Sequence, residues 1–309
     1  MRIVFFGSGD FALESLRALV EADRAPALVV TRPPRRRRRG GRDEPTPVHA
    51  AAEDGGIDVA TPEKVNAPES LDRLRAAAGE LFVVAEYGQI LGRALLAIPP
   101  KGTINVHGSI LPRWRGATPV EAALLAGDEE TGVTIQRTVF ELDAGPVLAT
   151  RRTAIAPDED AGSLRARLAV LGAGLLVEVV DAIASGRPPA ETPQYEGAVT
   201  YCRRLAPADA RIDWTKSAAE IERQVRAFLP RPGARTALQR DPPLEVALRR
   251  ARPVAGDGEP GVVRDAGGFL VGTGDGCLAV LEIVPASRRP MEARDFVNGY
   301  RLREGERFA

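Results

Sequence analysis

The sequence is poor in several features, and each scarcity excludes a class of protein. Its 309 residues include only two cysteines, Cys202 and Cys277, too few for a disulfide framework or a cysteine-rich zinc site. The longest uncharged apolar run, at 168–177, is far shorter than the ~18 residues that a membrane-spanning helix needs. The 42 Lys and Arg balance the 42 Asp and Glu, so the net charge alone does not indicate a nucleic-acid-binding protein. We therefore expect a soluble, cytoplasmic protein without a metal site.

Two further scarcities concern basic side chains. Lysine supplies only 3 of the 42 Lys and Arg, and this excess of Arg, with abundant Ala and Gly, is typical of a GC-rich genome. Only two histidines occur, so any imidazole chemistry must use His49 or His107.

The N-terminal segment has Arg2, a short apolar run and Asp10, which predicts a first strand and not a signal peptide.

The first half of the chain alternates short apolar runs with helix-like stretches. This spacing predicts βαβ units and a mostly parallel, doubly wound sheet. The later runs alternate in hydrophobicity, which favours two antiparallel strands and then a long apolar helix. The expected strands are 2–6, 27–31, 57–60, 81–85, 102–106, 133–139 and 146–155, and the expected helices are 11–20, 69–77, 120–125 and 161–184.

A change of composition divides the chain. Residues 189–204 lie in a proline-rich stretch with little apolar periodicity, which predicts a linker between an N-terminal domain (1–188) and a C-terminal domain (205–309). The C-terminal part has one amphipathic helix and about five short β-like runs, which favour a small OB-like barrel. From residue 204 onward, 18 Lys and Arg face 15 Asp and Glu, a net charge of +3.

The first turn, Gly7–Ala12, fits the pattern G-x-G-x-x-A between a strand and a helix. That pattern is typical of dinucleotide-binding proteins, in which glycines let a pyrophosphate approach a helix N-terminus. The second strand does not end in the acidic residue that holds a ribose; it runs into Arg32, which suits a 2′-phosphate. An NADP-dependent oxidoreductase therefore stays an alternative to a simple tight turn.

Five consecutive arginines, 35–39, lie in a polar loop at 32–47 that is too rich in Pro and Gly to form a regular element. Adjacent like charges repel one another, so such a run faces water or binds phosphates. The loop is therefore either a solvated connection or an RNA-phosphate contact.

The segment 104–117 has the sequence INVHGSILPRWRGA and contains the strongest candidate site. Asn105 and His107 are two residues apart near the end of a predicted parallel strand, so both side chains point to one face. Active sites of open α/β sheets lie at such carboxyl ends. An amide donor beside an imidazole suits a reaction in which an oxyanion forms and a proton moves. Asp143, in the turn Leu142–Gly145, is the candidate for orienting the imidazole.

These motifs together resemble the formyltetrahydrofolate-dependent formyltransferases, and most closely the branch that acts on methionyl-tRNA. The resemblance rests on the Asn-x-His pair with its following loop and on the Leu-Asp-Ala-Gly turn. It continues nearly end to end, through FFGSGDFA (5–12), EYGQIL (86–91), GDEETGVTI (127–135), ARIDW (210–214), RAF (226–228) and TGDG (273–276).

The resemblance implies a Rossmann-like catalytic domain, an OB-like tRNA-binding domain and a role in translation initiation. It implies transfer of a formyl group from 10-formyltetrahydrofolate to the amino group of initiator methionyl-tRNA by a monomer that needs no metal. By position, the catalytic residues are Asn105, His107 and Asp143. The corresponding folate-binding residues are Ser109, Ile110, Leu111 and Pro112, and the tRNA-binding residues are Arg35, Arg37 and Arg39.

The chain also departs from the family pattern. Gly9 stands where the family commonly has Pro, and Glu86 where it commonly has Ala. The arginine-rich loop and the segment 229–232 differ as well, but the catalytic positions are intact. Besides the oxidoreductase, two alternatives stay open: a formyltransferase that acts on a sugar-nucleotide amine, and a non-catalytic RNA-binding module.

Overall fold

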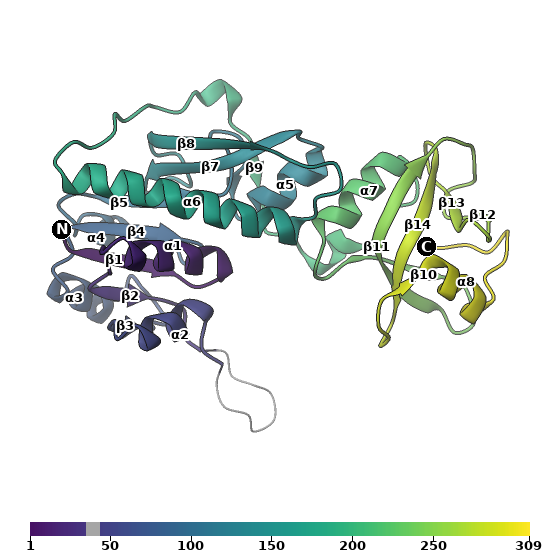
Figure 1. The fold of residues 1–309 in the computed structure, drawn as a ribbon, viewed down its shortest axis with the longest axis horizontal. Coiled ribbons are helices and arrows are strands. Elements are labelled where there is room, and N and C mark those ends of the chain that lie inside the picture. Colours follow the sequence, from purple (N-terminus) through teal and green to yellow (C-terminus); the bar gives the residue numbers. More distant parts are fainter. Residues whose placement is uncertain (35–43) are drawn as a thin grey trace. The chain divides into compact units, whose positions relative to one another are not determined.

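The computed structural model describes residues 1–34 and 44–309 (Figure 1). These residues form two compact units. Unit 1 consists of residues 1–119, 130–154 and 165–202, and unit 2 of residues 120–129, 155–164 and 203–309. Within the described ranges, no helix is both long enough and apolar enough to cross a membrane.

Unit 1 is built around a seven-stranded sheet with the order β3-β2-β1-β4-β5-β7-β8. The first five strands in this order are parallel, whereas β7 and β8 run antiparallel to their neighbours. The central strands consist almost entirely of buried apolar residues, as strands covered on both faces require. Their bounds are β1 Ile3–Gly7, β2 Leu28–Val30, β3 Val59–Ala60, β4 Leu81–Ala85, β5 Thr103–His107, β7 Glu130–Arg137 and β8 Val147–Ala154.

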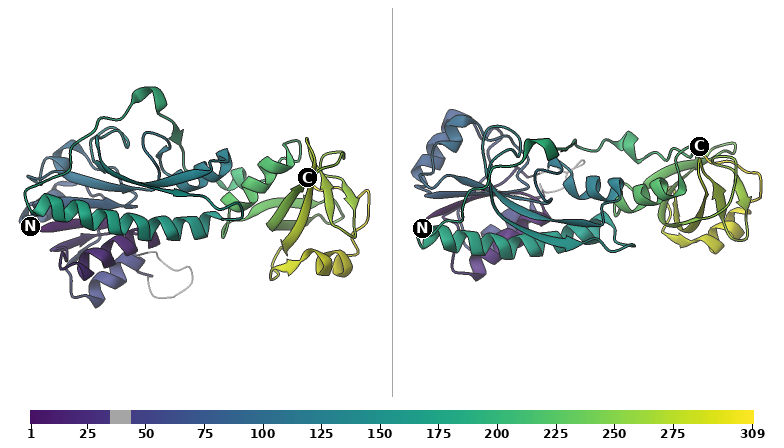
Figure 2. Two further views of the ribbon diagram at one scale, coloured as in Figure 1. Left: turned by 45° about the horizontal axis from the view of Figure 1, so that its top comes forward. Right: turned by 90° about the horizontal axis from the view of Figure 1, so that it is seen from above.

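Helices connect and cover these strands. The longest, α6 (Ala161–Ala184), lies along the sheet, as the views of Figure 2 show. Gly172 permits this approach: a Cβ there would lie 3.0 Å from side-chain atoms of both Val106 on β5 and Val133 on β7. The other helices of the first 126 residues are α1 Asp10–Glu21, α2 Pro47–Asp54, α3 Pro68–Ala76, α4 Arg93–Leu96 and α5 Pro119–Ala126. Nearly all of α5 belongs to unit 2.

Unit 2 contains an antiparallel sheet with the order β10-β11-β14-β13-β12, in which β15 also pairs with β14. Isolated bridges join Leu238 to Phe308 and Val262 to Arg307, so the chain end helps to close an OB-like barrel. The elements are α7 Ala218–Ala227, β10 Ala234–Leu238, β11 Leu244–Val254, β12 Val263–Asp265, β13 Leu270–Gly272, β14 Cys277–Pro285, β15 Met291–Glu292 and α8 Ala293–Tyr300.

An aromatic cluster fills the core of unit 2. Phe269 stacks on Phe296 with ring centroids 5.5 Å apart, and Phe308 packs against both Phe269 and Trp214. Trp214 is buried, and its indole Nε1 donates a hydrogen bond to the Thr236 hydroxyl at 3.0 Å. The Trp of the ARIDW motif is therefore a core residue whose polar atom is satisfied.

The structure confirms the predicted doubly wound fold and the small antiparallel domain that follows it. The domain boundaries at 188 and 205 stay a prediction. The segment 189–204, predicted as a linker, contains regular structure that its composition did not indicate. Its residues Tyr201–Cys202 form β9, which pairs in parallel with β6 (Arg115–Gly116), and Glu196–Ala198 form a 3-10 turn.

Candidate active site

The Asn105 and His107 side chains lie at the carboxyl end of β5, as the strand periodicity predicted. β5 pairs antiparallel with β7, which places Gln136 opposite Asn105 and Thr134 opposite His107. His107 is buried and Asn105 is half-buried. The antiparallel neighbour β7 therefore adds two polar side chains to the site. Sequence reasoning did not single them out, although their spacing of two on the predicted strand 133–139 indicates that both face the same side of the sheet.

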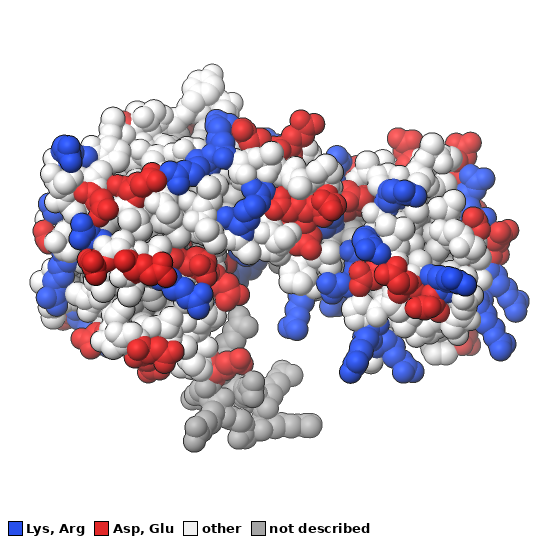
Figure 3. All heavy atoms as spheres, in the orientation of Figure 1, with Lys and Arg blue, Asp and Glu red and all other residues white. Residues whose placement is uncertain are grey.

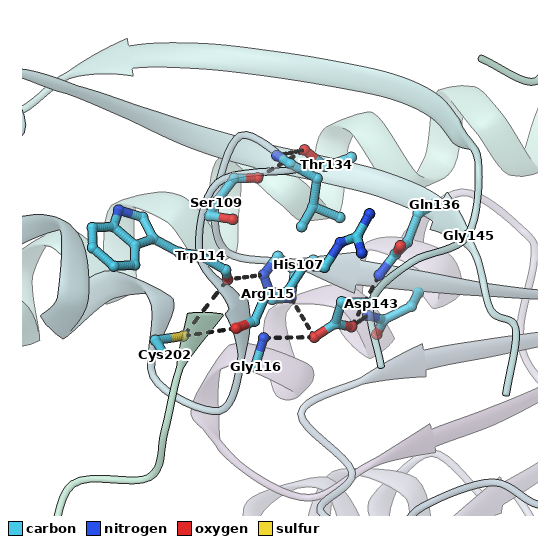
Figure 4. Close-up of polar contacts among 12 residues, drawn as sticks. His107, Ser109, Trp114, Arg115, Gly116, Thr134, Gln136, Asp143, Gly145 and Cys202 are labelled. Carbon is cyan, nitrogen blue, oxygen red and sulfur yellow. Dashed lines mark hydrogen bonds and ion pairs between the residues drawn. The ribbon is translucent and has the colours of Figure 1, made fainter. Parts of the chain in front are cut away.

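The two nitrogens of the His107 ring have different environments (Figure 4). Nε2 lies 2.9 Å from the carbonyl oxygen of Trp114, and because a carbonyl only accepts, Nε2 is the N–H donor. Nδ1 faces Oδ2 of Asp143 across 3.7 Å. The ring is thereby fixed by the backbone on one side and directed towards a carboxylate on the other.

Asp143 is the point at which the site converges. Its Oδ2 accepts a hydrogen bond from the Gly116 N–H at 2.9 Å, and its Oδ1 accepts from Gln136 Nε2 at 3.0 Å and from Asn105 Nδ2 at 3.4 Å. Its backbone has a positive φ of 49°, a conformation that Asp adopts more readily than most residues. The structure thus brings the three predicted catalytic side chains together, Asp143 from 36 residues beyond His107.

Close packing fixes the turn that carries Asp143. A Cβ on Gly145 would lie 1.8 Å from the carbonyl oxygen of Arg137, so only glycine fits there. Gly116, which donates to Asp143, has φ 122°, and a Cβ on it would lie 2.1 Å from the carbonyl oxygen of Cys202. Gly145 of the Leu-Asp-Ala-Gly turn and Gly116 of the loop after β5 are therefore both required by close backbone contacts.

The loop after β5 contains the four predicted folate-binding residues and is held by its own hydrogen bonds. Ser109 Oγ donates to the carbonyl oxygen of Arg113 at 2.6 Å. Thr134 Oγ1 donates to the carbonyl oxygen of Ser109 at 2.7 Å and accepts from the N–H of Leu111 at 3.2 Å. Ser109 and Leu111 are buried, whereas Ile110 and Pro112 are half-buried and accessible to a ligand.

The glycine-rich first turn has a carboxylate beside it. A Cβ on Gly9 would lie 2.4 Å from Glu86 Oε2, so the Glu86 carboxylate lies against the glycine. Arg165 Nη1 donates to Glu86 Oε1 at 3.1 Å. Because this carboxylate occupies the approach to the N-terminus of α1, a pyrophosphate there would meet a like charge. The two departures from the family pattern, at positions 9 and 86, are thus in direct contact.

The three predicted tRNA-binding arginines, Arg35, Arg37 and Arg39, lie outside the described residues. The two flanks of their loop are joined: the hydroxyls of Thr31 and Thr46 lie 2.8 Å apart. Within residues 1–34 and 44–309, no group of three or more His, Cys, Asp and Glu side chains could hold a metal ion.

Comparison with known protein families gives the class of this chain, which is a formyl-group transferase with Asn105, His107 and Asp143 at the carboxyl edge of its doubly wound sheet. The formyl transferase family model matches residues 1–180, and the model of the formyl transferase C-terminal domain matches residues 204–301. The chain is 46% identical to the methionyl-tRNA formyltransferase of Halorhodospira halophila over 99% of this chain and 98% of that protein. It is 40% identical to that of Parvibaculum lavamentivorans over the full length of both. The chain belongs to the methionyl-tRNA formyltransferases within the formyl transferase family.

Solved structures share the fold at low sequence identity. An N-formyltransferase from Helicobacter canadensis, in complex with folinic acid and dTDP-3-aminofucose, covers 91% of this chain and 99% of its own with a TM-score of 0.65 at 17% identity. HypX from Aquifex aeolicus in complex with tetrahydrofolic acid covers 97% of this chain and 47% of its own, with a TM-score of 0.60 at 18% identity.

The position of Glu86 predicts that NADP does not bind. The Glu86 side chain fills the space beside Gly9 that a pyrophosphate would need, and no acidic residue ends β2 to hold the ribose. Isothermal titration calorimetry with NADP at up to about millimolar concentration should detect no heat of binding. We expect any Kd to be weaker than ~1 mM, which corresponds to a binding free energy of only about −4 kcal/mol. Micromolar binding would contradict this interpretation and support the oxidoreductase alternative.

Proposed function

We propose that this chain transfers the formyl group of 10-formyltetrahydrofolate to the free amino group of methionyl-tRNA, producing the formylmethionyl initiator tRNA for translation initiation. The observation that carries the proposal is the 40–46% identity to methionyl-tRNA formyltransferases over essentially the whole chain. The relatives include both domains, so the similarity extends over both the catalytic site and the C-terminal barrel.

The reaction joins an amine to a formyl carbon and breaks the bond from that carbon to the folate nitrogen. The methionyl amine attacks the formyl carbon, and a tetrahedral intermediate forms with an oxyanion and a positively charged nitrogen. When it collapses, the amine has lost a proton and the leaving nitrogen of the folate has gained one. The protein therefore has to stabilise one negative oxygen and move one proton.

The proposed catalytic residues match these two tasks. Asn105 is half-buried, and its amide is the donor for the oxyanion; such a donor is typically worth ~2.7–4 kcal/mol of transition-state stabilisation. His107 and Asp143 are the proposed groups for moving the proton: Nδ1 and Oδ2 face one another across 3.7 Å, without a direct hydrogen bond between them. Ser109, Ile110, Leu111 and Pro112 are proposed to hold the tetrahydrofolate next to them.

The proposed tRNA-binding parts are the arginine-rich loop and the C-terminal domain. From residue 204 onward the chain has a net charge of +3, whereas residues 1–203 have 24 Lys and Arg against 27 Asp and Glu, a net charge of −3. Figure 3 shows basic side chains projecting from several elements of unit 2. An excess of Arg favours phosphate binding because the guanidinium donates two parallel hydrogen bonds to an anion.

The deciding experiment offers the protein two amine substrates. With 10-formyltetrahydrofolate as donor, we expect it to formylate methionyl initiator tRNA, as acid-urea gel electrophoresis would show, and to leave a sugar-nucleotide amine unchanged. Formylation of the sugar-nucleotide amine alone would replace the proposed substrate, and no transfer to either amine would contradict the proposed reaction.

The next prediction concerns the catalytic side chains. His107→Ala and Asn105→Ala should each lower kcat about 10²-fold or more, because each removes a group that acts on the transition state. His49→Ala is the matched control, since His49 is the only other histidine and lies on α2 with its Nε2 3.1 Å from Glu53 Oε1. Either active-site variant with more than half of the parent turnover would remove that residue from the mechanism.

The last prediction here concerns the arginine-rich loop. Replacing Arg35, Arg37 and Arg39 together by Gln should raise the KM for methionyl-tRNA and leave the KM for 10-formyltetrahydrofolate nearly unchanged. The slope of log affinity for tRNA against log salt concentration should become shallower by up to about one unit per lost contact. The control is the double variant of the exposed Arg17 and Arg75, which pair with neighbouring carboxylates. Equal slopes for the triple variant and the parent would indicate a solvated loop.

A further inference from the structure

One side chain of the segment predicted as a linker reaches the candidate active site. Gln194 is half-buried, whereas its neighbours from 191 to 198 are all exposed. Its amide Nε2 lies within hydrogen-bond distance of three oxygens: the carbonyls of Asp143 at 2.8 Å and Gly145 at 2.7 Å, and Oε1 of Gln136 at 3.2 Å. These contacts hold the backbone of the turn at Asp143 itself and at Gly145.

A buried arginine determines which way the Gln194 amide points. Arg115, only 2% exposed, donates from Nε to Gln194 Oε1 at 3.0 Å, and its Nη2 donates to Glu196 Oε1 at 3.0 Å. A guanidinium only donates, so it must face the amide oxygen, and the amide N–H groups then face the carbonyl oxygens. The backbone of Arg115 is held next to the site because its main-chain N–H donates a hydrogen bond to the carbonyl oxygen of Thr200, the residue immediately before β9.

The orientation of Gln194 in turn fixes that of Gln136, which donates to the Asp143 carboxylate. Because the NH2 group of Gln194 faces Gln136, the atom that Gln136 presents to it is its oxygen, Oε1. The NH2 group of Gln136 then points to Asp143 Oδ1 at 3.0 Å. Arg115, Gln194, Gln136 and Asp143 thus form a chain of hydrogen bonds in which each amide has one allowed orientation.

We infer that Gln194, oriented by Arg115, is a positioning residue for the formyl transfer. It holds Asp143 in the left-handed conformation and directs the second amide onto its carboxylate, which leaves Oδ2 facing His107. The inference rests on the proposed role of Asp143 in the reaction. It assigns to the segment 189–204, which the sequence predicts to be a linker, a part in the catalytic site.

The test replaces Gln194 by Met, which has a similar length and no hydrogen-bonding group. We expect kcat to fall about 10-fold or more, because small displacements of a reacting group cost up to ~10²-fold. The KM for each substrate should stay within about 3-fold of the parent value, since both ends of the Gln194 amide are bonded to protein groups. Gln194→Glu, which accepts from Arg115 but has no N–H to donate, should lose kcat as well. An unchanged kcat in Gln194→Met would overturn the inference.

The chain offers a matched control for the structural effect of the substitution. Gln224, in unit 2, is buried, and its Nε2 also donates to two backbone carbonyls, those of Asp209 at 2.9 Å and Arg211 at 3.0 Å. Gln224→Met should lower the thermal midpoint about as much as Gln194→Met but leave kcat unchanged. An equal fall in kcat for the two variants would show that the loss reflects general destabilisation and would overturn the inference.

A double-mutant cycle with Asp143→Asn separates this inference from the proposed function. If Gln194 acts through Asp143, Gln194→Met should have little further effect on kcat when Asp143 is already replaced. Equal losses in both backgrounds, with Asp143→Asn itself impaired, would overturn the role of Gln194 alone. Parent-like turnover of Asp143→Asn would overturn the proposed role of Asp143 and, with it, this inference.

Discussion

The antiparallel pairing of β5 with β7 is the constraint on which the rest of the site depends. It joins the last parallel strand to a strand that runs back, so the two polar positions of each strand face one another: His107 opposite Thr134 and Asn105 opposite Gln136. β7 therefore ends beside the start of β5, where the Thr138 N–H donates to the carbonyl oxygen of Thr103, and the segment that follows brings Asp143 back to Asn105 and His107.

The carboxylate of Asp143 sits in a strained but well-compensated position. A positive φ is unfavourable for a residue with a Cβ, and a half-buried carboxylate loses hydration. Donors from Gly116, Gln136 and Asn105 replace that hydration, and Gln194 holds the backbone carbonyls of Asp143 and Gly145. The site is therefore preorganised by its own side chains, which is the condition under which fixed dipoles lower a reaction barrier most effectively.

Sequence reasoning succeeded wherever the signal was local. The strand periodicity placed Asn105 and His107 on one face, and the Leu-Asp-Ala-Gly motif located the turn with Asp143. It failed for β6, β9 and the short helices α2, α4 and α8, which the apolar pattern did not predict. The two-residue strands β6 and β9 exist because residues 86 positions apart meet, and such a contact leaves no trace in local composition. Gln194 was missed for the same reason: its contacts are with residues about 50 positions away, and a glutamine in a Pro-rich stretch is typical of a solvated loop.

What the sequence by itself determined is therefore the order of the elements, the fold class and the family. These depend on periodicity, turn residues and motifs, which are properties of neighbouring residues along the chain. Only the tertiary structure decided that Glu86 lies against Gly9, and that Arg115, Gln194 and Gln136 orient Asp143. The physical reason is that hydrogen bonds and like-charge repulsion act over a few ångströms in space, and folding sets those distances between residues far apart in the chain.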